Sequence, residues 1–493
     1  MVFMAGVGIC FVNEIYANLS FQKCMQSCCI MTVKIEWFGG EPLCKCNFDF
    51  IIKILNKLAR KFIKFNMEQF FVIGQNRLNG EVKIDSAKNS LLPIIACSIL
   101  IEGEVRLENV PKYSDVLAMA KIIESLGGKV QFDGDDLIIN CHILDNNCIC
   151  NELASAVRSS IFALGPILGR MGSAKVAYPG GCDIGLRPID LHLKGLRDLG
   201  AKVNEKNGYI YASGEGLVAN NLTLTFPSVG ATENLMMLAT VIDGQTRIFN
   251  PAREPEIVDL QNFINSAGGD VHGAGGNEII INGGRKLHST SFHAMPDRIE
   301  AGTYIIAVAM CGGKVALKGA KICDNGALIA KLSKSACKIE EKGDNIIVSS
   351  DGKPKSFGEI ETAVYPGFPT DLQAQMTALA TVSEGYSLII ENLFENRCKH
   401  VGELIKMGAN IRTRNGIIIV GGQEKLYGSQ VTATDLRGGA SLVLAGLCAE
   451  GYTTIDNISL IDRGYYKMEE KLGALGANIV RVDVEKEVDN CNL

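Results

Sequence analysis

Apolar stretches and polar turns alternate along this chain in an order that returns roughly every 70 residues after residue 67. Each repeat contains an apolar stretch suited to a buried helix, followed by a glycine-led turn that opens a short strand. Four of the helical stretches are 91–100, 161–168, 235–242 and 441–448. The turns begin at Gly103, Gly172, Gly244, Gly312, Gly385 and Gly451. The pattern therefore predicts six copies of one structural unit.

A second helix and a hairpin complete each unit. The helix is amphipathic, and it ends at a glycine that suits the positive φ of a helix C-terminus, as at Gly127, Gly200, Gly408 and Gly476. Two strands follow, joined by Asn207-Gly208 in one copy and by Asn415-Gly416 in another. Asn-Gly favours a two-residue hairpin turn. The unit is therefore βαβαββ.

Six such units predict an α/β fold with two domains of three units each and a ligand-binding cleft between them. The last unit ends early, because the strand predicted at 478–484 lacks a hairpin partner, whereas the strands predicted at 70–73 and 81–84 belong to no unit. Strands need partners, so we expect both N-terminal strands to complete the last unit. The expected domains are 88–296 and 67–87 with 297–485, followed by a tail at 486–493.

Composition narrows the class of protein. Of 493 residues, 21% are charged and 47% hydrophobic, the balance of an ordinary globular protein. The formal net charge of -5 argues against a broad nucleic-acid-binding surface. The sequence has no apolar run of about 20 residues, so we do not expect stable membrane insertion. Most of the 17 cysteines are expected to be reduced, buried core residues of a cytoplasmic protein, because no CxxC motif has a matching CxxC or HxxxH partner. We expect no metal and no cofactor; the oligomeric state is left open.

The first 66 residues differ from the rest of the chain. They hold six of the 17 cysteines and the single tryptophan, Trp37. The segment 37–42 resembles the Gly-Gly-Glu-Pro segment of radical S-adenosylmethionine enzymes, but the cysteine triplet of those enzymes is incomplete, because Met31 follows Cys24 and Cys28. Residues 48–65 predict a basic amphipathic helix, whose basic face we interpret as solvated; binding of this helix to a membrane surface is the alternative. We interpret 1–66 as an extension, a fusion scar or the result of an early start codon, before a working protein that starts at Met67. A separate iron–sulfur function of this segment stays an alternative.

Unusual residues gather where strands pass into helices, the places at which free backbone N–H groups attract anions. Taken singly, each has an ordinary explanation: Lys88 as a surface charge, Cys182 as a core thiol, Asp371 as a helix cap, and Arg397 and Arg463 as surface ion pairs. Their equivalent places in a sixfold repeat indicate a shared site.

The motifs at these junctions resemble those of the enolpyruvyl transferases, over residues 67 to about 484. The segments that carry the resemblance are Ala87-Lys88-Asn89, Pro179-Gly180-Gly181-Cys182 with Arg187-Pro188, 252–257, Phe368-Pro369-Thr370-Asp371 and Asp462-Arg463-Gly464-Tyr465. The resemblance implies two inside-out α/β domains. It also implies transfer of the enolpyruvyl group of phosphoenolpyruvate to the 3′-hydroxyl of UDP-N-acetylglucosamine, with release of phosphate, as the first committed step of peptidoglycan synthesis. One departure is Ser86, where the family usually has glycine.

The resemblance also implies roles for residues. Cys182 is the acid that protonates the CH2 carbon, can carry a covalent phospholactoyl group and is the target of fosfomycin, whereas Asp371 is the base. Lys88, Arg187 and Arg463 surround phosphoenolpyruvate, and Arg158 reaches toward the nucleotide. The positions that hold or close upon the sugar nucleotide are Asn89, Ser228, Val229, Gly230, Asp297, Phe394 and Arg397. The positions that support these or couple the loops are Glu254, Asp435 and Arg437.

Two further readings stay open. One is the branch of the same family that acts on shikimate 3-phosphate, against which the Pro-Gly-Gly-Cys loop argues, because that branch does not use a cysteine there. The other is a non-catalytic protein that binds a nucleotide sugar.

Overall fold

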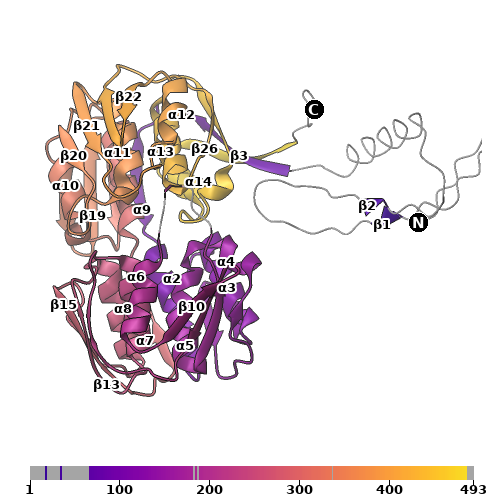
Figure 1. The fold of residues 1–493 in the computed structure, drawn as a ribbon. Coiled ribbons are helices and arrows are strands. Elements are labelled where there is room, and N and C mark those ends of the chain that lie inside the picture. The colour runs from indigo at the N-terminus through magenta and orange to yellow at the C-terminus, as the bar shows by residue number, and fades with distance from the viewer. Residues whose placement is uncertain are drawn as a thin grey trace, which may run out of the picture. The chain divides into compact units, whose positions relative to one another are not determined.

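The computed structural model describes residues 17–18, 34–35, 66–180, 184–185, 188–335 and 337–485 (Figure 1). Residues 68–483 form one compact unit, and residues 1–67 with 484–493 form another. In the second of these, β1 (Ala17–Asn18) pairs antiparallel with β2 (Lys34–Ile35). The helix predicted at 48–65, the cysteines before Met67 and the tail at 486–493 lie outside the described residues.

The unit 68–483 contains six four-stranded sheets with one common order. In each, an edge strand runs parallel to its neighbour, and the next strand runs antiparallel to that neighbour. The predicted hairpins are present: Asn207 and Gly208 have φ of 52° and 76°, and Asn415 and Gly416 have φ of 48° and 77°. Both residues of each turn are left-handed, as a type I′ turn requires. The predicted sixfold βαβαββ repeat is confirmed.

Three sheets and their helices form the first lobe, which we define as residues 88–292. The sheets, in strand order, are β16 (Thr290–Phe292), β5 (Glu104–Leu107), β7 (Asp136–Asn140) and β6 (Lys129–Asp133); β8 (Cys148–Ile149), β9 (Ser173–Ala177), β11 (Tyr209–Ser213) and β10 (Lys202–Lys206); and β12 (Asn221–Thr223), β13 (Gly244–Phe249), β15 (Glu278–Gly283) and β14 (Val271–His272). The helices are α2 (Lys88–Cys97), η1 (Ser98–Leu100), α3 (Ser114–Ser125), α4 (Asn151–Ala156), η2 (Arg158–Ala163), α5 (Leu164–Met171), α6 (Asp190–Asp198), α7 (Val229–Ala239) and α8 (Pro255–Ser266).

The other three sheets belong to the second lobe, which we define as β3, β4 and all elements from α9 to β26. The sheets are β4 (Leu78–Lys83), β17 (Gly313–Lys318), β19 (Asn345–Ser350) and β18 (Lys338–Lys342); β20 (Glu359–Glu361), β21 (Tyr386–Ile390), β23 (Ile417–Gly421) and β22 (Asn410–Arg414); and β24 (Gln430–Thr432), β25 (Tyr452–Asp456), β3 (Asn66–Ile73) and β26 (Asn478–Glu485). The helices are α9 (Arg298–Cys311), η3 (Ile322–Asn325), α10 (Gly326–Leu332), η4 (Thr370–Leu372), α11 (Gln373–Thr381), α12 (His400–Lys406), α13 (Leu436–Cys448), η5 (Ile458–Leu460) and α14 (Met468–Ala474).

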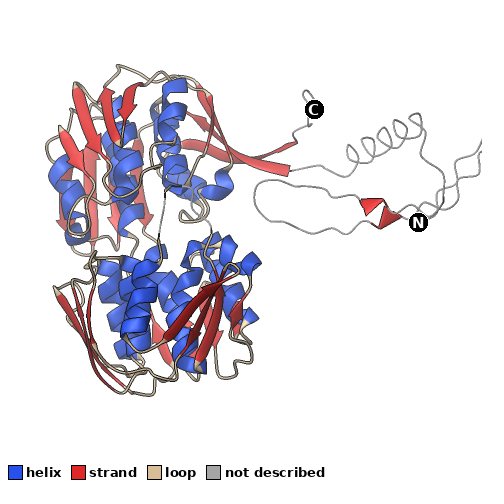
Figure 2. Ribbon diagram, viewed as in Figure 1, coloured by secondary structure: helices blue, strands red, loops and turns tan. Residues whose placement is uncertain are grey.

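Helices occupy the centre of each lobe and sheets cover them (Figure 2). In the second lobe α9, α11 and α13 pack on one another and are buried along nearly their whole length. The strands around them alternate buried and exposed residues, so only one face of each sheet contacts the helices. Each lobe has its own hydrophobic core. Within the described ranges, no helix has the length and apolar character needed to cross a bilayer.

The two N-terminal strands go to different sheets. β3 pairs antiparallel with β25 and lies beside β26, so it completes the last unit as predicted. β4 pairs parallel with β17 in the unit that contains α9. The prediction that both strands complete the last unit is therefore wrong for β4. The physical reason is that β3 alone fills the hairpin position beside β26, whereas β17 still lacks a parallel edge strand until β4 pairs with it.

The chain crosses between the lobes twice, and the two crossings pair with each other. One crossing joins β4 of the second lobe to α2 of the first, and the other joins β16 of the first lobe to α9 of the second. Ala87 N donates to Met295 O at 2.7 Å, and Asp297 N donates to Asp85 O at 2.8 Å. Ser86 forms a bridge with Pro296, and its hydroxyl donates to Asn109 O at 3.1 Å. This antiparallel pair of crossings ends at two of the predicted site residues, Lys88 and Asp297.

Candidate active site

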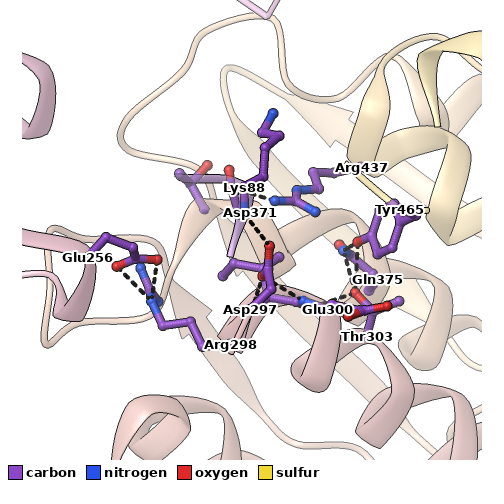
Figure 3. Close-up of polar contacts among 12 residues, drawn as sticks. Lys88, Glu256, Asp297, Arg298, Glu300, Thr303, Asp371, Gln375, Arg437 and Tyr465 are labelled. Atoms are coloured by element: carbon purple, nitrogen blue, oxygen red, sulfur yellow. Dashed lines mark hydrogen bonds and ion pairs between the residues drawn. The ribbon is translucent and has the colours of Figure 1, made fainter. Parts of the chain in front are cut away.

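Lys88 is the first residue of α2 and points its side chain at a carboxylate. The backbone N of Lys88 donates to Asp297 Oδ2 at 3.3 Å (Figure 3), and its Nζ lies 3.1 Å from Asp115 Oδ2. A lysine at a helix start opposes the helix dipole, so it needs anionic partners. The two aspartates supply them, and the Lys88 side chain is only 10% exposed.

Asp115 holds a second cation, from the other lobe. Arg463 Nε lies 2.9 Å from Asp115 Oδ1, and Arg463 Nη2 lies 3.4 Å from Asp115 Oδ2. Burial by itself would raise the pKa of Asp115, but Lys88 and Arg463 together hold that pKa below its ordinary value. Asp115 therefore stays ionised and joins α2 and α3 of the first lobe to the segment after η5 in the second.

Asp371 lies in η4, directly before α11, between two arginines. Arg397 Nη2 is 2.6 Å from Asp371 Oδ1, and Arg437 Nη2 is 3.1 Å from Asp371 Oδ2 (Figure 3). Partial burial favours the neutral acid, yet the two guanidinium groups hold the pKa of Asp371 well below its ordinary value. Lys88 adds to this effect, so the Lys88–Asp115 group and the Asp371 group are electrostatic neighbours.

Glu391 fixes the loop that carries Phe394 and Arg397. Its Oε1 accepts from the Thr362 hydroxyl at 2.9 Å and from the backbone N of Phe394 at 3.1 Å. Its Oε2 accepts from the Thr370 hydroxyl at 2.8 Å, and Thr370 Oγ1 in turn accepts from Arg397 Nη1 at 3.0 Å. The Arg397 guanidinium also lies 5.4 Å from the centre of the Phe394 ring.

Three further predicted residues cap helices. Asp297 Oδ1 accepts from the backbone N of Ile299 and Glu300 at the start of α9, and Asp435 Oδ1 accepts from Arg437 and Gly438 at the start of α13. Ser228 Oγ accepts from Ala231 N at the start of α7. These caps satisfy backbone N–H groups in the first turns of α9, α13 and α7. Arg437, in such a first turn, is buried and lies 5.2 Å from the centre of the Tyr465 ring.

The remaining predicted residues of the first lobe stand at the starts of its helices. Arg158 Nη1 donates to Pro179 O at 3.1 Å, at the start of the Pro-Gly-Gly-Cys loop. Gly230 follows Val229 at the start of α7, where a Cβ would lie 2.9 Å from Phe162 Cε1, so a larger residue would require the Phe162 ring to move. Asn89 is half-buried in the first turn of α2. Burial raises the pKa of Glu254, next to the buried ion pair of Arg298 Nε with Glu256 Oε1 at 3.0 Å (Figure 3).

Cys182 and Arg187 lie outside the described residues. The two described residues between them contact the second lobe: Ile184 O accepts from Asn396 N at 3.0 Å. Gly185 has a φ of 138°, and a Cβ there would lie 3.2 Å from Glu395 N. Both the backbone angle and this close approach require glycine.

No role was assigned from the sequence to Asp115, Glu391, Glu256 or Arg298. Asp115 stands at a strand-to-helix junction, after β5 and in the first turn of α3, which is the signal that selected the other residues and could have found this one. Among the described residues, no group of three or more His, Cys, Asp and Glu side chains is placed to hold a metal ion. What the site does contain is several cations and two ionised carboxylates, an arrangement suited to anionic substrates and proton transfer.

The sequence matches one family and a set of curated relatives. The family described as EPSP synthase (3-phosphoshikimate 1-carboxyvinyltransferase) matches residues 72–472. UDP-N-acetylglucosamine 1-carboxyvinyltransferase 1 of Caldanaerobacter subterraneus subsp. tengcongensis is 48% identical over 416 residues, which are 84% of this chain and all of that protein. UDP-N-acetylglucosamine 1-carboxyvinyltransferase of Yersinia pestis is 44% identical over 420 residues, which are 85% of this chain and all of that protein.

Solved structures share the fold at lower identity. The enolpyruvyl transferase NikO from Streptomyces tendae superposes with a TM-score of 0.77 at 22% identity, over 85% of this chain and all of that one. EPSP synthase from Acinetobacter baumannii superposes with a TM-score of 0.64 at 19% identity, over 84% of this chain and all of that one. The predicted α/β fold of two repeated halves is thus confirmed.

Proposed function

The chain belongs to the UDP-N-acetylglucosamine 1-carboxyvinyltransferase family, and from this premise we propose that it transfers the enolpyruvyl group of phosphoenolpyruvate to the 3′-hydroxyl of UDP-N-acetylglucosamine. Phosphate is the second product. The observation that carries the proposal is that curated relatives of this name match the chain along their entire length. The reaction would take place in the cytoplasm and begin peptidoglycan synthesis.

The reaction is an addition followed by an elimination. In the addition, the sugar 3′-oxygen bonds to C2 of phosphoenolpyruvate, the hydroxyl loses its proton to a base, and an acid delivers a proton to C3. The product is a tetrahedral ketal that still carries the phosphate. In the elimination, C3 loses a proton, the bond from C2 to the phosphate oxygen breaks, and the double bond returns. One acid, one base and several cations are therefore required.

Cys182 is the proposed acid and Asp371 the proposed base. Asp371 is ionised throughout the neutral range, because Arg397 and Arg437 lower its pKa, so it is always ready to accept a hydrogen bond from the sugar hydroxyl. The same arginines make it a weak base. A bound anion beside Arg397 would offset their charge and raise the proton affinity of Asp371, so we expect the base to become effective only with both substrates present.

Lys88, Arg187 and Arg463 are proposed to bind the phosphate and carboxylate of phosphoenolpyruvate. Asp115 sets the spacing of Lys88 and Arg463 through the contacts of 3.1 Å and 2.9 Å. Asn89, Arg158, Ser228, Val229 and Gly230 from the first lobe are proposed to hold the sugar nucleotide. From the second lobe Asp297, Phe394 and Arg397 would join them, with Glu254, Asp435 and Arg437 in support. The domain boundaries at 88–296 and at 67–87 with 297–485, and the cleft between the domains, stay part of this proposal.

An acceptor comparison tests the function. The purified protein is given phosphoenolpyruvate with either UDP-N-acetylglucosamine or shikimate 3-phosphate, and released phosphate is measured. We expect phosphate with the nucleotide sugar alone. Release with shikimate 3-phosphate alone would assign the chain to the other branch of the family, and nucleotide-sugar binding without any release would make it a binding protein.

Mass spectrometry tests the role of Cys182. After incubation with phosphoenolpyruvate we expect a phospholactoyl adduct on the peptide that contains Cys182, and after incubation with fosfomycin an alkylated thiol on the same peptide. The Cys182→Ser variant should show neither product. Adducts that persist in this variant would contradict the assignment.

A further inference from the structure

Two helices of the second lobe end in cysteines whose sulfur atoms touch. Cys311 is the last residue of α9 and Cys448 the last of α13, and their Sγ atoms lie 3.2 Å apart, within hydrogen-bond range for thiols. Both are partly exposed and lie at the rim of the second core. Among the nine free cysteines that the structure describes, no other two share a hydrogen bond.

The pair is remote from the chemistry proposed above. α9 begins beside Asp297, and α13 begins beside Asp435, so each helix has its first turn at the site and its cysteine at the opposite end. At 1.5 Å per residue, these helices of 13 and 14 residues separate the two ends by about 20 Å. The proposed mechanism uses neither thiol, so their contact needs another explanation.

We propose that Cys311 and Cys448 are a redox-responsive pair, which a low-molecular-weight disulfide such as oxidised glutathione converts to an intramolecular disulfide that fastens α9 to α13. The bond would form by two exchanges. The Cys448 thiolate attacks one sulfur of the small disulfide, which leaves a mixed disulfide on Cys448 and releases one glutathione thiolate. The Cys311 thiolate then attacks the Cys448 sulfur, and the second glutathione thiolate leaves. Two cysteine thiols are oxidised, one small disulfide is reduced to two thiols, and protons pass through solvent.

The hydrogen bond between the two thiols indicates which of them reacts first. The pKa of the Cys311 thiol lies well above its ordinary value, because it shares a hydrogen bond with Cys448 and because most of its surroundings are protein. A raised pKa disfavours the Cys311 thiolate, so Cys448 is the first sulfur to react. Once the mixed disulfide exists, Cys311 is already in contact with it, and this proximity favours the second exchange over attack by solvent thiols.

The expected consequence is a more stable second lobe. The two cysteines are 137 residues apart in sequence, so their bond would close a long loop and restrict the unfolded chain. In a reducing cytoplasm the pair stays open, and oxidising conditions would close it reversibly.

Peptide mapping of the full-length protein tests the proposal. The protein is incubated with oxidised glutathione, its remaining thiols are blocked, and it is digested without reductant. We expect a linked peptide that contains Cys311 and Cys448 and is two hydrogen atoms lighter than the two separate peptides, together with a rise in the thermal midpoint of about 5 °C that dithiothreitol reverses. Absence of the linked peptide, or a linked protein whose midpoint does not rise, would overturn the proposal.

Three variants distinguish the roles of Cys311 and Cys448. Cys448→Ser should form no link and should leave Cys311 unmodified, whereas Cys311→Ser should stop at one glutathionyl group on Cys448. The matched control is Cys323→Ser, which removes an exposed thiol and should keep the link. A glutathionyl group on Cys311 in the Cys448→Ser variant would overturn the assigned order.

Discussion

At the scale of single residues, Asp115 joins two of the cations that are proposed to bind phosphoenolpyruvate, Lys88 and Arg463. It is buried, it stays ionised, and it binds a lysine from one lobe and an arginine from the other. A buried carboxylate between two cations costs desolvation, which its two partners offset only while all three remain. Asp115 therefore acts as a positioning residue for Lys88 and Arg463.

Replacing Asp115 should impair substrate binding and folding together. In Asp115→Asn we expect kcat/KM for phosphoenolpyruvate to fall by about 10- to 100-fold, because the two cations lose their spacing. The free energy of unfolding should fall by about 3 kcal/mol, because two buried cations lose their partner. Steady-state kinetics and urea unfolding measure both. The control is Asp133→Asn, whose partner Arg106 is exposed, and it should change either quantity little. Normal kinetics in Asp115→Asn would show that Asp115 does not position the cations.

Gly185 offers a second test, of the contact between the Pro-Gly-Gly-Cys loop and residues 394–396. Gly185→Ala should lower kcat/KM about tenfold, because a Cβ is strained at a φ of 138° and crowds Glu395 N. Gly134→Ala is the control: Gly134 also has positive φ, at 63°, but a Cβ there meets nothing within 4 Å. Full activity in both variants would mean that this contact does not matter for the reaction.

Individual residues show where prediction from the sequence stopped. Lys88, Asp297, Asp371, Arg397 and Arg437 were selected by motif. The structure joins Lys88 to Asp297, and Asp371 to both arginines; their catalytic roles stay predictions. Asp115 was missed because an aspartate in the first turn of a helix is normally explained by the helix dipole alone. The contact of Cys311 with Cys448 was missed because two cysteines 137 positions apart give no spacing signal.

At the scale of elements, the paired crossings carry a buried cluster of charges. Lys471 Nζ lies 2.7 Å from Asp85 Oδ2 and 2.6 Å from Glu300 Oε1, and Asp85 N donates to Glu300 Oε2 at 2.8 Å. Burial, which outweighs the attraction of Lys471, raises the pKa of Glu300 to about 7. The cluster sits on one crossing, the first turn of α9 and α14.

This cluster should make stability depend on pH. The pKa of Glu300 is higher in the folded chain than its ordinary 4.5, so folding favours the protonated acid. The resulting stability is present below about pH 4.5 and is lost as the pH rises to about 7. Glu300→Gln, which imitates the protonated acid, should remove this slope, a difference of up to about 3 kcal/mol between pH 4.5 and 8. Urea unfolding across that range measures it, with exposed Glu424→Gln as the control. Equal slopes in Glu300→Gln and the parent would exclude Glu300 as the cause.

Elements were easier to predict than their pairing. The hairpins and helix ends follow from local signals, namely Asn-Gly pairs and glycines that must adopt positive φ, and they are where the sequence placed them. The partner of β4 could not be predicted, because an apolar strand carries no local sign of which distant parallel neighbour it joins. Only the structure shows that β4 is the edge strand beside β17.

At the scale of the whole molecule, the second lobe depends on residues near the beginning of the chain. Phe70 and Val72 of β3 are fully buried in the second core. A chain that starts at Met67 keeps β3 and should fold and turn over substrate like the full chain. A chain that starts at Gln75 leaves β25 and β26 without their shared neighbour and should lose cooperative unfolding and activity. Circular dichroism melts and phosphate release compare the two. A cooperative, active protein that starts at Gln75 would contradict this account.

The distant pairing of β4 also means that its partner strand is made much later during synthesis on the ribosome. Asn79 of β4 is 235 residues from its neighbour Lys314, so at roughly 5–20 residues per second the strand waits on the order of ten seconds or more before that neighbour is made. The three sheets of the first lobe have all their strands once β16 has been synthesised. In contrast, β3 and β4 lack their partners until β25 and β17 have been synthesised. The nascent chain must therefore keep β3 and β4 from pairing with strands of other proteins while the first lobe is already folded.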